Sequence, residues 1–311
     1  MQQRSSKFKA AWRFGAGLAA AALVLAACGN ANAGKTNTTG NTGTAGHGQP
    51  TKGGTAYWAE PPGVKPDWIF PFASLQFFSV ANFQQFQYLM YRPLYYFGPH
   101  GTADPTVAYP LSPGNQPVFS DHDSRLTISL KGWKFHNGQV VDAQSVIFWL
   151  NLIKAEGAAN WAGYAAGPDQ FPGNIKSYEA ASPTALSLTI TLDSSYNPTW
   201  YLYNELSQIT PMAEAWDVTS TTARPGSGGC GVVLDGQQMT GMEASIQKAC
   251  AKVWTFDTDN GGKSSHAQMA ADQATYASNP LWAAGADGPW ILTGFNTSGE
   301  STFTPNSRYS G

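Results

Sequence analysis

The sequence predicts a mixed α/β fold in which strands and helices alternate irregularly. Two neighbouring patterns carry this prediction. One is a strand-like alternation of apolar residues at Leu126, Ile128 and Leu130. The other is a helical spacing of apolar residues at Val146, Ile147, Leu150 and Ile153. With 311 residues, 42% of them hydrophobic, the chain is long enough for two domains with packed cores.

The first 27 residues have the layout of a secretory signal peptide. A basic stretch, MQQRSSKFKAAWR, precedes the apolar run FGAGLAAAALVLAA, which is too short for a good transmembrane helix. The run ends in LAAC, and small residues before a cysteine resemble the lipobox of bacterial lipoproteins. In those proteins the signal is cut before a cysteine that becomes lipid-modified, which here would be Cys28. The alternative is an ordinary signal peptide followed by an incidental cysteine.

Residues 28–53 are rich in glycine, asparagine and threonine and contain almost nothing apolar, so we expect a flexible tether. The lipobox and the tether together predict an extracytoplasmic protein, lipid-anchored to the outer face of the bacterial cytoplasmic membrane. The formal net charge is −2 and no basic patch stands out, which argues against nucleic acid as a partner.

Two cysteines remain, Cys230 and Cys250. Export places them in an oxidising compartment, and an even number favours a disulfide between them. The alternative is a pair of free thiols.

Local patterns predict several further elements. GGTAYWAEPP indicates a short strand that ends at Glu60, and the residues around 78–90 have near-helical spacing. The other expected elements are a hairpin of residues 175–180 and 186–192, a helix from Pro198 to about Ser207, a helix over 240–253, and a hairpin formed by GPWILTGF and STFTPN.

The stretch KGWKFHNGQVVDAQSVIFWLN combines a turn with the start of a helix. Asn137-Gly138 is a strong tight-turn signal, and Asp142 can cap the helix that follows, with Ser145 three positions on. We therefore interpret His136 as a residue beside a turn, and not as a catalytic group or a metal ligand.

The order of these pieces resembles the family 5 extracellular solute-binding proteins, which serve ABC importers of peptides, dipeptides and nickel. The segments that carry the resemblance are YRPLYYFGPHG, SRLTISLKGWKFHNGQVVDAQSVIFWL, DGPWILTGF and FTPNSRYSG. Two departures are Trp290 in place of the usual tyrosine and Ser310 where tryptophan is usual.

The resemblance implies an α/β fold of the type II periplasmic-binding-protein kind (cluster C). Residues 54–85 and 197–311 would form a discontinuous, incomplete lobe I, and residues 86–196 would form an inserted α/β subdomain. Members of the family continue well beyond the last matching segment, so we expect the second lobe to be missing from this chain.

The resemblance implies a protein that captures a peptide or another small solute and delivers it to an ABC permease and ATPase complex. Such a protein would be a monomer, with no enzymatic activity and no cofactor. Carried over by position, the ligand-binding residues would be Trp58, Glu60, Phe77, Phe78 and Trp290. For each aromatic residue the alternative is a role in the core, and for Glu60 it is a solvated strand end.

Patterns for catalysis are lacking, so no catalytic residue and no metal ligand are predicted. The pairs Asp121/Asp123 and Asp257/Asp259 could in principle bind calcium, but DTDNGG lacks the closing glutamate of an EF-hand loop. The alternative function is a secreted, lipid-anchored hydrolase or a glycan-binding protein.

Overall fold

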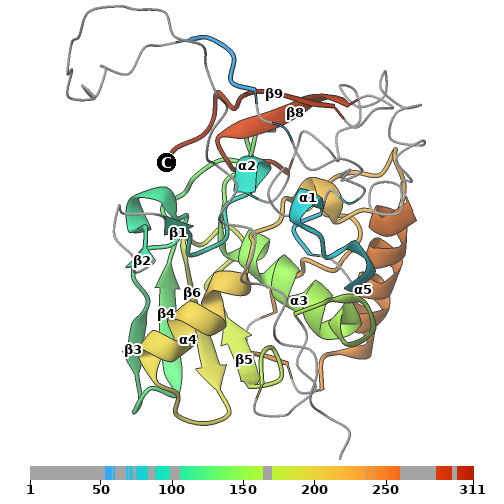
Figure 1. Ribbon diagram of the computed structural model, residues 1–311. Helices are drawn as coiled ribbons and strands as arrows, with labels where there is room; N and C mark the ends of the chain where they lie inside the picture. The colour runs from blue at the N-terminus through green and yellow to red at the C-terminus, as the bar shows by residue number, and fades with distance from the viewer. Residues whose placement is uncertain are drawn as a thin grey trace, which may run out of the picture. The chain divides into compact units, whose positions relative to one another are not determined.

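The computed structural model describes residues 53–57, 59, 68, 70–72, 75–82, 88–98, 106–163, 170–234, 236–239, 241–259, 285–295 and 300–311 (Figure 1). Cys28, Trp58 and Glu60 lie outside these residues. Residues 53–57 have no regular secondary structure, so the strand expected to end at Glu60 is not formed in its described part. None of the described helices is long and apolar enough to cross a membrane.

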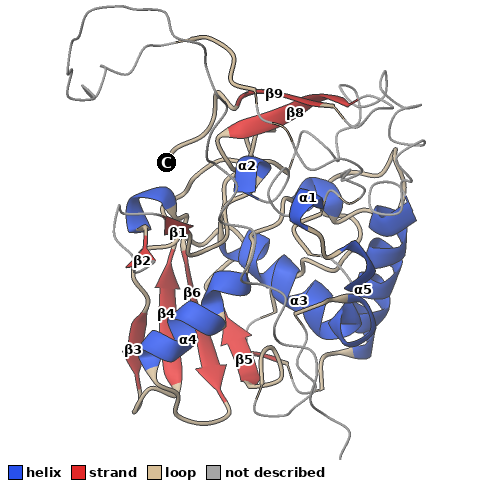
Figure 2. Cartoon of the chain, in the orientation of Figure 1, coloured by secondary structure: helices blue, strands red, loops and turns tan. Residues whose placement is uncertain are grey.

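The largest sheet has five antiparallel strands in the order β3-β4-β6-β5-β7 (Figure 2). The strands are β3 (Val118–Ser120), β4 (Arg125–Ser129), β5 (Ile175–Glu179), β6 (Ser187–Leu192) and β7 (Gln237–Gln238). The predicted β4 strand and the predicted β5–β6 hairpin are both confirmed. A separate two-stranded sheet joins β1 (Phe97–Gly98) to β2 (Thr106–Val107).

The two faces of the large sheet differ in polarity. Leu126 pairs with Ile190 and Ile190 with Tyr178, so these three buried side chains share one face. The opposite face carries threonines and the ion pair between Arg125 and Glu179. Helix α3 (Ala143–Asn160) packs on the apolar face, where the Tyr178 hydroxyl donates to Asn151 Oδ1 over 2.9 Å.

Helix α3 begins as the sequence predicts. Asp142 accepts a hydrogen bond from the Ser145 backbone N–H at 3.2 Å, and the Ser145 hydroxyl interacts in return with the Asp142 N–H, which completes a capping box. The preceding turn also forms, with Gly138 at a φ of 93° that a residue with a Cβ rarely adopts.

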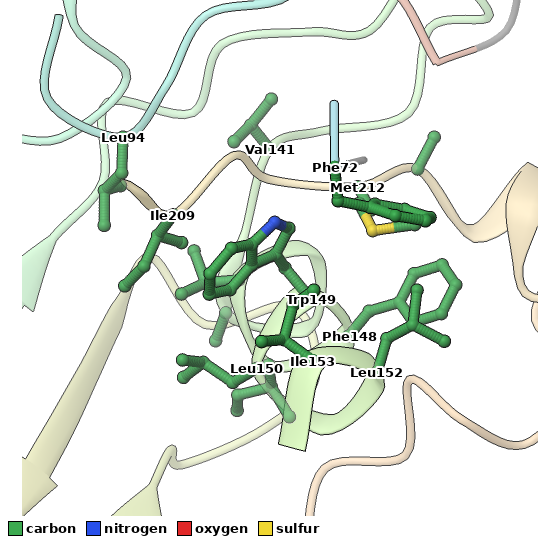
Figure 3. Packing of buried hydrophobic residues seen from close by; sticks show 14 of the residues in the cluster. Phe72, Leu94, Val141, Phe148, Trp149, Leu150, Leu152, Ile153, Ile209 and Met212 are labelled. Atoms are coloured by element: carbon green, nitrogen blue, oxygen red, sulfur yellow. The ribbon is translucent and has the colours of Figure 1, made fainter. Parts of the chain in front are cut away.

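The prediction that α3 buries a single face is too narrow. Phe148, Trp149 and Leu152 are buried as well as the predicted residues, because the helix lies between the sheet on one side and other segments on the other. Figure 3 shows Trp149 with Leu94 and Ile209 on one side of its indole in this view and Phe72 and Met212 on the other.

Helix α5 (Ala244–Asp257) packs against α3 and carries one half of the disulfide. Cys230 and Cys250 are bonded and fully buried, which confirms the predicted pair. Both cysteines belong to the main hydrophobic core cluster.

The other helical segments are shorter. Helix α4 (Pro198–Asn204) is capped by Asn197 and continues into the 3₁₀ turn η4 (Leu206–Gln208), close to the predicted span. The 3₁₀ turn η1 (Leu75–Phe77) precedes the stretch 78–90, in which the described residues form the helical segments α1 (Val80–Asn82) and α2 (Tyr88–Met90). Residues 83–87 lie outside the described residues.

The C-terminal hairpin joins β8 (Trp290–Phe295) to β9 (Ser301–Pro305), as predicted. A backbone hydrogen bond just before β8 attaches the hairpin to the end of α2: the Gly288 N–H donates to the Met90 carbonyl over 2.7 Å. A Cβ at Gly288 would lie only 2.6 Å from the Met90 carbonyl carbon, so this approach requires glycine.

Arg92 makes further contacts with the residues on either side of the hairpin. The Arg92 N–H donates to Asp287 Oδ1 at 2.9 Å, and the Arg92 guanidinium lies over the rings of Tyr96 and Tyr309. Burial raises the pKa of the Asp287 carboxyl to about 7, although the N–H and the charge of Arg92 act in the opposite direction.

The proposed division into lobe I and an inserted subdomain stays a prediction. Strand β7, from the predicted lobe I, pairs with β5, from the predicted subdomain. Residues from both parts contribute to one buried core cluster.

Replacing Asp142 by alanine removes the acceptor that caps α3, so we expect the free energy of unfolding to fall by about 1–2 kcal/mol. Urea denaturation measures the change. Asp142→Asn retains the side-chain oxygen and serves as the matched control. Equal stability of the Ala and Asn variants would contradict the capping role.

Replacing Asp287 by asparagine keeps the acceptor for the Arg92 N–H but removes the titration. Because the folded-state pKa of Asp287 lies above its usual value, its protonated form stabilises the fold at low pH, and this stability is lost as the pH rises from about 4 to 7.

The wild-type chain should therefore lose stability relative to Asp287→Asn between pH 4 and pH 8, by up to about 4 kcal/mol. Urea denaturation at each pH measures the difference. A gap between wild type and Asp287→Asn that does not change with pH would refute the assignment.

Candidate functional site

A pocket of about 220 Å³ lies where four separate segments of the chain meet. These are the residues before and after η1, helix α2 with the residues that follow it, the end of α3, and η4. Its aromatic and proline lining consists of Pro71, Phe72, Phe78, Tyr88, Tyr91, Pro93 and Trp161. The remaining lining residues are Ala162, Gly163, Ser207, Gln208 and Thr210.

Backbone hydrogen bonds bring two of these segments together. The Leu94 N–H donates to the carbonyl of Ile209 over 2.7 Å, so the chain after α2 runs beside the chain after η4. The Met212 N–H in turn donates to the carbonyl of Ser145, in the first turn of α3. The pocket is therefore attached to the most buried helix of the fold.

Trp161 forms the wall at the end of α3. Its N–H donates to the carbonyl of Gly157 and closes the helix, and its indole packs edge-on against Trp149 with ring centroids 5.3 Å apart. Phe171 completes this aromatic group at 6.3 Å from Trp161. These contacts hold the Trp161 ring in place from the core side.

The side chain of Asn82 organises the segment that carries Phe72 and Phe78. It accepts the Trp68 N–H at 3.1 Å and donates to the Phe77 carbonyl at 2.6 Å. These two bonds tie α1 to the residues before it. Phe72 is buried and packs on Trp254 of α5, with ring centroids 4.7 Å apart.

Tyr91 and Thr210 are the buried lining residues that carry a hydroxyl. Tyr91 is 1% exposed, and its hydroxyl has no hydrogen-bond partner in the described part of the chain. Burial, and secondarily the charge of Asp287, raises the pKa of the Tyr91 hydroxyl well above its usual value. The hydroxyl is therefore neutral at physiological pH.

Glu205 is the acid closest in sequence to the η4 wall. It accepts a hydrogen bond from Gln208 Nε2 at 3.3 Å, and burial raises the pKa of its carboxyl to about 7. Near neutral pH a large fraction of this group is protonated, so it adds little negative charge beside the pocket.

Among the predicted ligand-binding residues, Phe78 lies in the pocket lining and is 58% exposed. Phe77 is half-buried and stacks on Trp68 with ring centroids 4.5 Å apart, while Trp290 is 39% exposed on β8; neither belongs to the lining. Trp58 and Glu60 lie outside the described residues.

Tyr88, Tyr91 and Trp161 could not be identified as lining residues from the sequence. They lie on segments about 70 residues apart, and only their clustering in space marks them. The aromatic richness of residues 68–97 was the only available signal.

The other candidate groups are not part of the pocket lining. The ring Nδ1 of His136 is hydrogen-bonded to Asn306 Oδ1 at 3.2 Å, and the backbone N–H of His136 donates to the Ala286 carbonyl. His136 therefore joins the predicted turn to the segments that flank the C-terminal hairpin. Asp257 is fully buried whereas Asp259 is exposed. In the described part of the chain, His, Cys, Asp and Glu side chains form no group of three or more that could hold a metal ion.

Comparison with known proteins gives matches only at the level of structure. No protein-family model and no curated protein matches the sequence. Among solved structures, the peptide-bound DppA from Helicobacter pylori matches at 12% identity with a TM-score of 0.40, over 75% of this chain and 36% of its own. Peptide-bound OppA from Listeria monocytogenes matches at 17% identity with a TM-score of 0.38, over 71% and 34%.

NikA from Brucella suis, in complex with Fe(III)-EDTA, matches at 16% identity with a TM-score of 0.35, over 72% of this chain and 31% of its own. The chain thus spans about a third of the length of these solved structures. Of these, DppA is described as an ABC transporter-associated periplasmic binding protein.

Proposed function

We propose that this chain is the substrate-binding component of an ABC importer, and that it captures oligopeptides and delivers them to the permease. The observation that carries the proposal is the aromatic pocket: Phe78, assigned to ligand binding from the sequence resemblance, is one of its lining residues. The protein performs no chemistry in this scheme, and ligand capture is followed by hinge closure around the ligand.

The frame that carries the sequence resemblance supports the proposal. Strand β4, the turn at Gly138 and the helix cap at Asp142 form in the order that the resemblance implies. The Gly-Pro loop of the resemblance also forms, and its glycine is required by the close approach of Gly288 to Met90.

Peptides are the ligand class that the pocket suits best. Aromatic walls provide a large contact area at a small cost in side-chain entropy, which fits ligands of varied sequence. We retain Trp58, Glu60, Phe77 and Trp290 as proposed ligand residues beside Phe78. In this scheme Glu60 meets the positive amine of a peptide by a charge-assisted hydrogen bond.

The direct test is isothermal calorimetry of the full chain with three mixtures: tri- to pentapeptides, oligosaccharides, and nickel with histidine. Saturable heat with the peptides is expected, and with neither of the others. Binding of oligosaccharides alone would replace the proposal by the glycan-binding alternative. The absence of heat with peptides would reject it.

We also propose that Cys28 is lipid-modified, that residues 28–53 form the tether, and that the protein acts as a monomer at the outer face of the cytoplasmic membrane. Expression of the full chain in a bacterium, followed by mass spectrometry of the mature N-terminus, tests this. The expected first residue is a diacylglyceryl-modified Cys28, and Cys28→Ser should retain the uncut leader. A mature chain that starts at another, unmodified residue would exclude the anchor.

A further inference from the structure

We propose that the pocket between η1, α2, the end of α3 and η4 binds an uncharged aromatic ring. This inference rests on the proposed function, since it assigns to the pocket one part of the captured ligand: a neutral aromatic side chain, and not a charged terminus of the peptide.

The size of the pocket limits what it can take. Sites for drug-sized ligands usually have volumes of about 300–1,000 Å³, whereas this pocket has about 220 Å³. It therefore holds a single chemical group. Phe78 and Tyr88 are 58% and 51% exposed, so the pocket opens to solvent between partly exposed rings and an external group can enter it.

The walls of the pocket favour an aromatic group. Phe72, Tyr91 and Trp161 provide rings that are held from the core side, by Trp254, Trp216 and Trp149 respectively. Aromatic pairs contribute about 0.5–1.5 kcal/mol beyond the burial of their area, so a flat ring gains more here than an aliphatic chain of similar size.

The electrostatics exclude a charged group. None of the described lining residues carries an acidic or basic side chain. The guanidinium of the neighbouring Arg92 is engaged with the Tyr88 carbonyl, at 2.6 Å, and with the rings of Tyr96 and Tyr309. A carboxylate or an ammonium that entered the pocket would lose hydration without gaining a counter-ion, which is costly.

Two polar groups of the lining are already engaged. The Ser207 hydroxyl donates to the Tyr203 carbonyl at 2.7 Å, and Gln208 Nε2 donates to the Asn204 carbonyl at 2.5 Å. The Tyr91 hydroxyl is buried and presents no accessible surface to the pocket, so its ring alone contributes to the wall. The contacts that favour a ligand here are therefore those of its ring.

The experiment is an NMR titration of the full chain with p-cresol, the neutral phenol, and with three matched probes: toluene, 4-methylbenzoate and 4-methylbenzylammonium. Saturable binding of p-cresol and of toluene is expected, with the two charged rings at least tenfold weaker. Equal affinity for a charged ring, or no binding of p-cresol, would overturn the proposal.

One variant locates the binding. Phe78→Ala removes an exposed wall without opening the core and should weaken the binding of p-cresol about tenfold. Trp200→Ala, which removes an exposed aromatic residue outside the lining, is the control and should leave the affinity unchanged. An unchanged affinity in Phe78→Ala would place the binding elsewhere and refute the assignment.

The outcome is separable from that of the proposed function. Peptide binding in calorimetry together with a failure of p-cresol to bind would reject the pocket assignment alone. Binding of p-cresol that depends on Phe78, with no peptide binding, would reject the peptide function and leave the pocket assignment in place.

Discussion

Helix α3 is buried on nearly all sides, and the other layers of the described structure pack on it. A helix in this position can carry few polar side chains, because each of them must find a hydrogen-bond partner inside the protein. Asn151 meets this requirement in full: its amide oxygen accepts the Tyr178 hydroxyl of β5, and its amide nitrogen donates to the Cys230 carbonyl at 2.8 Å. One buried side chain thereby joins the sheet, the helix and the disulfide-bonded segment.

The pocket follows from the way α3 ends. Trp161 closes the helix, and the chain after η4 runs back along α3 through the contact of Met212 with Ser145. The segment after α2 pairs with that chain at Leu94 and Ile209. Aromatic rings from three separate regions consequently face a common space, and their positions depend on the same core that buries Trp149.

Two buried acids, Asp257 and Asp287, are not among the described lining residues of this pocket. Asp257 is fully buried, neither of its carboxylate oxygens has a hydrogen-bond partner among the described residues, and burial followed by the charge of Asp217 raises its pKa well above the usual value. Asp287 is held under the C-terminal hairpin with a raised pKa. Both acids favour the folded state more at mildly acidic than at alkaline pH.

The sequence by itself determined the elements whose signals are local: the turn at Gly138, the cap at Asp142, the hairpin of β5 and β6, helix α5 and the C-terminal hairpin. A turn residue, a cap or an alternating pattern acts over a few neighbouring positions, so it can be recognised without knowledge of the fold. The disulfide was also predictable, but only from the compartment and the number of cysteines.

Only the tertiary structure decided how far α3 is buried, that the disulfide lies in the core, and which rings line the pocket. The reason is physical: burial and pocket shape depend on contacts between residues far apart in the chain, such as Tyr88, Trp161 and Gln208. The contact between the Asn82 amide and Trp68, 14 positions away, has the same origin, because no local propensity encodes it.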